Sequence, residues 1–209
     1  MVTIVGIGGT PREGSSTERA LSLVLRSASD RGAAVTLFGG QKLAKLPLFN
    51  AEMASRSPEQ LELVETARRA DGRLIASPGY HGSISGLVKN GLDTLEDLRE
   101  DKRPYLDRRA VGCIVNAFGW QACGTTLSAL RSIVHALRGW PTPYGATLNS
   151  TDGLFDDFDE CKSTLAEWQL TTVSDQVLRF ALAQPMSVCS QGSIPDQHIH
   201  HKSLQLNGI

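Results

Sequence analysis

The sequence predicts one α/β domain, a three-layer α/β/α sandwich with a five-stranded parallel sheet in its centre. Five short apolar runs alternate with longer segments that carry apolar residues at helical spacing. The runs are mostly continuous rather than alternating, as expected of strands whose two faces are both covered by helices. A chain of 209 residues is long enough for one well-packed domain and short for two.

The expected strands are separated by helix-patterned segments, as β-α units require. They are residues 3–8, 34–38, 72–77, 110–117 and 144–148. Two of the helices have capping signals: Ser15 with Glu18 three residues later, and Ser57 with Gln60. The negative charges of three aspartates are expected to introduce the last helix: Asp156, Asp157 and Asp159.

Composition excludes several classes of partner. The net charge of −1 gives no electrostatic case for nucleic acid or an anionic membrane. No apolar run approaches the roughly 20 residues that a bilayer span requires. The four cysteines are scattered, without the spacing of a metal site, as in proteins of a reducing compartment. We therefore expect a cytoplasmic protein with no metal, nucleic-acid or membrane partner.

The domain is expected to span residues 1–184. Residues 185–209 show no sustained periodicity, and we interpret them as an irregular tail, disordered or ordered only against a partner subunit. The charged stretch "REDKRPYLDRR", residues 99–109, is expected to be a solvated loop.

The stretch "GIGGTPREGSST", residues 6–17, lies between the first strand and the first helix. It fails as a dinucleotide loop because Pro11 occupies the third glycine's place, and as an ATP loop because Ser15 replaces the lysine. The second strand also ends without the acidic residue that would hold a ribose. These failures favour the flavodoxin-like strand order 2-1-3-4-5, in which this loop holds a mononucleotide phosphate. The hydroxyl and cationic donors are Thr10, Arg12, Ser15, Ser16 and Thr17.

A second stretch, "IASPGYHGSISGLVKNGLDTL", spans residues 75–95 at the carboxyl end of the third strand. Its Pro and Gly residues allow the backbone to approach a flat ring, and Tyr80 offers a stacking face. "GSISG" is not a nucleophile elbow because Ile84 stands where serine is required. Ser83 and Ser85 are interpreted as hydrogen-bond partners of the ring or of a helix end.

These two stretches resemble the motifs of the NAD(P)H-dependent FMN reductase family, flavodoxin-like proteins that also include quinone, azo-dye and chromate reductases. The phosphate-loop motif is matched by Gly9, Thr10, Arg12, Ser15 and Thr17. The longer flavin motif is matched by Ser77, Pro78, Tyr80, Gly82, Ser83, Ser85, Gly86, Val88, Lys89, Asn90, Leu92 and Asp93. The resemblance covers roughly residues 1–182.

The resemblance implies an FMN site made of three loops. Thr10, Arg12, Ser15, Ser16 and Thr17 would hold the phosphate. The isoalloxazine would lie along Pro78, Gly79, Tyr80, His81, Gly82 and Ser83, and would be bordered by Phe118, Gly119 and Trp120. Gly79 and His81 depart from the family pattern, which frequently has Glu and Asn there. Both positions face the ring or the substrate pocket in relatives, so the resemblance does not carry a substrate preference over to this chain. His81 is either a contact to the substrate or a plain loop residue.

The resemblance also implies hydride transfer from NADPH or NADH to N5 of FMN and on to an acceptor, such as free flavin or a quinone. No catalytic side chain is required for that half-reaction. One alternative is a reductase of a specific organic or biosynthetic substrate that retains its FMN. Another is a flavodoxin-type electron carrier, which the near-neutral charge and Arg12 disfavour. Relatives imply a homodimer or homotetramer.

Overall fold

The computed structural model, which describes residues 1–151 and 153–184, confirms the predicted sheet. Four strands run parallel in the order β2 (Ala34–Phe38), β1 (Thr3–Gly8), β3 (Gly72–Tyr80) and β5 (Ala110–Ala117). The fifth position is divided between β6 (Trp140–Pro141) and β7 (Ala146–Asn149), which both pair in parallel with β5. A short antiparallel strand, β4 (Ser83–Ile84), folds back on the end of β3 and was not expected from the sequence.

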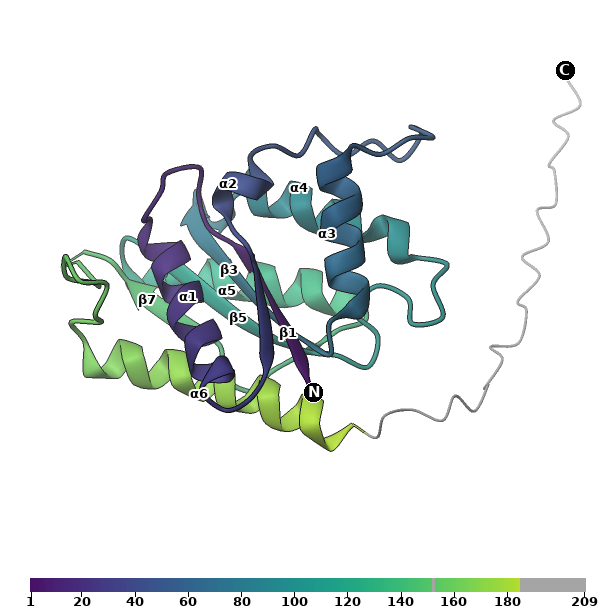
Figure 1. Ribbon diagram of the computed structural model, residues 1–209. Coiled ribbons are helices and arrows are strands. Elements are labelled where there is room, and N and C mark those ends of the chain that lie inside the picture. The colour runs from purple at the N-terminus through teal and green to yellow at the C-terminus, as the bar shows by residue number, and fades with distance from the viewer. Residues whose placement is uncertain (152, 185–209) are drawn as a thin grey trace, which may run out of the picture.

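Helices cover both faces of this sheet (Figure 1). On one face, α1 (Ser16–Ser29) and α6 (Thr164–Ala183) bury their apolar sides against one core cluster. On the other face, α3 (Pro58–Arg69), α4 (Gly86–Thr94) and α5 (Trp120–Ala136) pack on a second cluster. A 3₁₀ turn at Leu95–Leu98 directly follows α4. A short helix, α2 (Gly40–Leu43), follows β2. The molecule is therefore the three-layer sandwich that the sequence predicts.

Helix capping follows the sequence in α3 and departs from it in α1. Ser57 and Gln60 form the complete reciprocal capping box at the start of α3. Ser15 caps α1 by accepting from the N–H of Glu18 at 3.3 Å. The Glu18 carboxylate does not complete the box but accepts from the N–H of Gly40 at 2.9 Å. The second half of the predicted box is therefore wrong, because a tertiary donor replaces the local one.

The predicted acidic start of α6 is also wrong. The helix begins at Thr164, and its cap is Ser163, whose hydroxyl accepts from the N–H of Ala166 at 3.2 Å. The aspartates lie in the preceding loop, where Asp156 accepts from two backbone N–H groups of that loop. Asp159 forms an ion pair with Arg19 at 2.9 Å. These carboxylates therefore stabilise the loop before α6 rather than the start of the helix.

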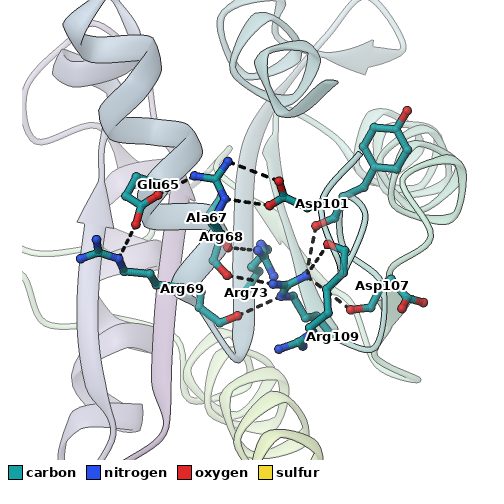
Figure 2. A network of polar contacts seen from close by, with 11 residues as sticks. Glu65, Ala67, Arg68, Arg69, Arg73, Asp101, Asp107 and Arg109 are labelled. Carbon is teal, nitrogen blue, oxygen red and sulfur yellow. Dashed lines mark hydrogen bonds and ion pairs between the residues drawn. The ribbon is translucent and has the colours of Figure 1, made fainter. Parts of the chain in front are cut away.

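The charged stretch 99–109 is more ordered than a solvated loop, because it ends in a buried arginine. Arg109 is only 2% exposed. Its Nε donates to the carbonyl of Ala70 and its Nη2 to that of Arg68, both at 2.9 Å, while Nη1 reaches the Tyr105 carbonyl at 3.2 Å (Figure 2). Burial lowers the pKa of Arg109 to about 10. A single side chain thus binds the carboxyl end of α3 to this stretch.

A second arginine supports the same helix end from within the sheet. Arg73, in β3, is fully buried and donates through Nη2 to the carbonyl of Ala67 (Figure 2). Burial lowers its pKa well below the usual value, and nearby Arg109 lowers it further. Cations are favourable at the carboxyl end of a helix, where unpaired carbonyls concentrate negative charge.

Candidate active site

The strand register brings the three predicted site loops to one edge of the sheet. Gly8, the last residue of β1, pairs with Ala76 of β3, and Pro78 further along β3 pairs with Asn116 of β5. The carboxyl ends of these adjacent strands therefore lie side by side, as Figure 1 shows. In open parallel sheets, this edge is where ligands bind.

The loop after β1 places hydroxyl groups at the start of α1. Ser15 and Thr17 are 2% exposed, whereas Thr10 is half-buried and Arg12 is exposed. Because Ser15 already caps the N–H of Glu18, the N–H groups of Ser16 and Thr17 are the first-turn donors without a hydrogen bond to another described residue. A helix amino end with free N–H groups and hydroxyls is suited to an anion.

The start of α2 supports this loop from the side, and sequence reasoning missed it. A Cβ added to Gly40 would lie 1.9 Å from the carbonyl oxygen of Thr10, so only glycine permits this approach. Gln41 donates from Nε2 to the carbonyl of Pro11 at 2.5 Å, and Glu18 holds the N–H of Gly40. The available sequence signal was the Gly-Gly pair at the end of β2.

The charges around the loop fit a phosphate dianion. Arg19 is engaged by the loop before α6, through the carbonyl of Asp156 at 2.9 Å and the carboxylate of Asp159. Arg12 forms no ion pair with any described residue, so its guanidinium is available. Hydroxyls, first-turn N–H groups and one uncommitted cation make up a donor set that fits the phosphate of FMN.

The turn between β3 and β4 explains one departure from the family pattern. His81 has φ 51° and Gly82 has φ 84°, and they form a two-residue turn between the paired residues Tyr80 and Ser83. Positive φ at both central residues is typical of a type I′ hairpin, which favours Asn-Gly. His is one of the few other residue types enriched at positive φ. The turn conformation therefore accounts for the presence of a residue such as His81 at this exposed position.

The other departure, Gly79, is explained by close packing of α5. A Cβ added at Gly79 would lie 2.7 Å from Oγ1 of Thr126 and 2.9 Å from Cβ of Ala117. Thr126 also donates to the carbonyl of Ser83 at 3.4 Å, so α5 lies directly against the hairpin. The space that a glutamate would need is occupied by α5 and the end of β5.

The loop after β5 presents two large aromatic side chains at this edge. Phe118 is 79% and Trp120 is 60% exposed, and Tyr80 of β3 is 53% exposed. Between the first two, Gly119 has φ 93° and donates its N–H to Oδ1 of Asn149 at 3.0 Å. Asn149, at the end of β7, thus fixes the start of α5, a role that sequence reasoning missed.

Cys123 lies beneath this loop, enclosed by the protein. It is fully buried, and its Sγ lies 3.4 Å from the carbonyl oxygen of Leu148. Burial raises the pKa of its thiol. Within residues 1–151 and 153–184, there is no cluster of three or more side chains suited to a metal. No helix in the same part of the chain combines the length and apolarity that crossing a membrane requires.

The chain is similar to known flavin-dependent reductases over most of its length. Residues 2–152 match the model of the NADPH-dependent FMN reductase family. The chain belongs to this family. It is 33% identical over 190 residues to an FMN-dependent NADPH-azoreductase of Staphylococcus saprophyticus, covering 86% of this chain and 95% of the relative. Membership confirms the predicted oxidoreductase activity, FMN as cofactor and NAD(P)H as reductant.

Solved structures confirm the flavodoxin-like fold of this family member. An NADH:FMN oxidoreductase in its apo form is similar with a TM-score of 0.69 and 19% identity, over 90% of this chain and 92% of that one. A flavodoxin of Streptococcus pneumoniae has a TM-score of 0.58 and 11% identity, over 84% of this chain and 98% of its own.

Proposed function

We propose that the three loops at the carboxyl edge hold FMN in the arrangement that the family motifs imply. The phosphate binds Arg12, the hydroxyls of Thr10, Ser15, Ser16 and Thr17, and the first-turn N–H groups of α1. The ring lies along residues 78–83 and against the loop at 118–120. The support is the convergence of these residues at one sheet edge. Donors suited to a dianion lie in the loop after β1, and exposed aromatic side chains lie at the end of β3 and in the loop after β5.

FMN, when bound, would supply the redox chemistry, a two-electron transfer between the nicotinamide and the acceptor. The chain's own contribution is positioning. The β3–β4 hairpin has a defined conformation, because its turn residues have the φ values of a tight turn and α5 packs against it. A rigid platform sets the distance and the angle between two stacked rings, which is how an active site lowers the entropic cost of transfer.

We propose that the electron acceptor is a planar aromatic molecule. The observation that carries this proposal is the exposure of Tyr80, Phe118 and Trp120 around the candidate ring site. Large aromatic side chains favour flat, apolar partners by stacking and edge contacts. Quinones, azo compounds and free flavin all satisfy this description, and the relatives of this chain include FMN-dependent NADPH-azoreductases.

The first test is the visible spectrum of the purified protein, recorded before and after anaerobic addition of NADPH. We expect a flavin spectrum that NADPH bleaches and that one equivalent of a quinone or azo dye restores. Steady-state kinetics then distinguishes two mechanisms. Either free flavin enters, is reduced and leaves, or an acceptor is reduced by FMN that stays bound to the protein. A protein that neither binds added FMN nor oxidises NADPH in its presence would overturn the proposal.

We also propose a homodimer or homotetramer in the cytoplasm. Trp140 and Trp168 support assembly, because they are 60% and 53% exposed although each contacts another aromatic ring, Phe180 and Tyr144 respectively. Light scattering of the wild type and of Trp140→Lys tests this proposal, and a monomeric wild type would contradict it. The predicted tail, residues 185–209, lies outside the described residues.

A further inference from the structure

Asn116 lies in the middle of the candidate site edge, and neither the family motifs nor the comparisons assign it a role. It is the penultimate residue of β5, and its register partners are Pro78 on β3 and Leu148 on β7. It therefore lies between the strand that leads into the hairpin and the strand that supports the loop after β5.

The direction of the Asn116 side chain follows from the pleat. Ile114, two residues earlier, belongs to the core cluster under α1 and α6, whereas Val115 belongs to the cluster on the other face. Because side chains alternate along a strand, Asn116 points to the face covered by α1 and α6. That is the face on which the first turn of α1 presents its phosphate-binding donors at the same sheet edge.

The carbonyl oxygen of the Asn116 side chain is buried and has no hydrogen-bond partner among the described residues. The residue is 7% exposed, and its Oδ1 is inaccessible to solvent and accepts no hydrogen bond from the described residues. The neighbouring carbonyl of Ala117 is already bonded to Ser150. A buried amide oxygen left unpaired is costly, so such a group indicates a partner other than the described residues, such as a bound ligand.

We propose that the Asn116 amide binds a hydroxyl of the ribityl chain of FMN, an inference that rests on the proposed function. An amide both accepts and donates, which matches a hydroxyl group. In the proposed arrangement the phosphate lies at the start of α1, and the ring lies along the end of β3 and the loop after β5. The ribityl chain, which joins phosphate and ring, therefore crosses the sheet edge where β3 and β5 end. Asn116 is the buried polar side chain at that crossing.

The test compares flavins with and without the polyol. Kd values are measured by fluorescence titration of FMN, riboflavin and lumiflavin, which lacks the ribityl chain, with the wild type and with Asn116→Leu. Leucine keeps the branched shape and removes both polar atoms. We expect FMN and riboflavin to bind about ten-fold more weakly and lumiflavin to bind unchanged. Asn116→Ser, which keeps a hydroxyl, should restore part of the loss.

Asn90 provides a matched control and thermal stability an independent measurement. Asn90 is part of the stretch that matches the flavin motif, but it lies in α4, outside the three site loops. Its amide makes structural bonds, accepting from the N–H of Phe49 at 2.8 Å and donating to the carbonyl of Pro47 at 3.0 Å. Asn90→Leu should therefore lower the Tm of the apoprotein and leave the riboflavin-to-lumiflavin preference unchanged. Asn116→Leu should not lower the apoprotein Tm, because an unpaired buried amide is replaced by an apolar group.

The outcomes separate the two proposals. Equal weakening of all three flavins by Asn116→Leu, or no weakening of any, would overturn the ribityl contact while leaving the FMN site in place. Failure of the wild type to bind FMN at all would overturn the proposed function and the inference with it.

Discussion

The carboxylate of Glu18 accepts a hydrogen bond from the backbone N–H of Gly40 at 2.9 Å and so joins the first turn of α1 to the start of α2. Added Cβ atoms at Gly9 and at Gly39 would lie 2.8 Å and 3.1 Å from the same carboxylate oxygen. Glu18 is thus enclosed by glycines from two loops. It positions the phosphate loop at the cost of placing a negative charge beside it.

Two substitutions at Glu18 should separate its effect on the position of the phosphate loop from the effect of its negative charge. Glu18→Ala leaves the buried Gly40 N–H without an acceptor, so we expect a lower Tm and FMN binding weakened by about 1–2 kcal/mol. Glu18→Gln keeps an acceptor oxygen and removes the charge that repels the phosphate. Its FMN affinity should equal or exceed that of the wild type at low salt, with the difference shrinking as salt rises. Weaker binding by Glu18→Gln than by Glu18→Ala would contradict this role.

Arg12 is the uncommitted cation of the phosphate loop. Arg12→Ala should weaken FMN binding by roughly 1.5–3 kcal/mol, as for loss of a charge-assisted hydrogen bond, and should affect riboflavin little because riboflavin has no phosphate. Arg26→Ala is the matched control, since Arg26 is an exposed residue in the last turn of α1, at the end of this helix far from the phosphate loop. Isothermal titration of both variants checks the prediction, and unchanged FMN affinity in Arg12→Ala would rule out a phosphate contact.

The hairpin turn should tolerate asparagine at position 81 and resist a β-branched residue. His81→Asn places a favoured residue at φ 51°, so we expect the Tm to stay the same or rise. His81→Val forces a branched side chain into that conformation and should cost about 1–2 kcal/mol of unfolding free energy. Denaturant unfolding measures both variants. If His81 also contacts the substrate, His81→Asn will change the KM for the acceptor, whereas a plain turn residue leaves it unchanged.

Gly79 should be intolerant of any side chain while α5 keeps its present position. Gly79→Ala brings a methyl group against Thr126 and Ala117, and such overpacking costs about 1–3 kcal/mol. In the double variant with Thr126→Ala, Oγ1 is absent and part of that loss should be recovered. A double-mutant cycle on unfolding free energies gives the coupling. Additive effects would show that Thr126 does not limit this position.

The sequence predicted the parts of this fold that depend on local chemistry. The capping of α3 by Ser57 and Gln60 involves residues three apart, and the loop after β1 is a continuous stretch whose residue types are directly visible. The strand order was predicted because the loop after β1 fits neither the dinucleotide-binding nor the ATP-binding pattern. The convergence of the loops then follows from parallel strands alone.

The contacts that sequence reasoning missed join residues far apart in the chain. Glu18 has a local partner in the sequence pattern but bonds Gly40, 22 residues away. Arg109 stands in a stretch of alternating charges, yet its guanidinium binds carbonyls at the end of α3, 39 and 41 residues away. Their targets are backbone atoms, which every residue type carries. No side-chain pattern therefore distinguishes these partners before the fold is known.

The buried cysteines should be unreactive in the native state. Burial raises the pKa of Cys113 to about 12, and the pKa of Cys123 is also raised, so both remain thiols at pH 8. The variant Cys161→Ser/Cys189→Ser retains only these two and should show no fast reaction with an aromatic disulfide reagent until guanidinium unfolds it. The folded pKa of the Cys113 thiol exceeds its unfolded value. The stability that comes from keeping this thiol protonated is therefore present at neutral pH and is lost as the pH rises from about 9 to about 12. Cys113→Ala should remove that part of the alkaline destabilisation, and rapid labelling of the native double variant would contradict the inert assignment.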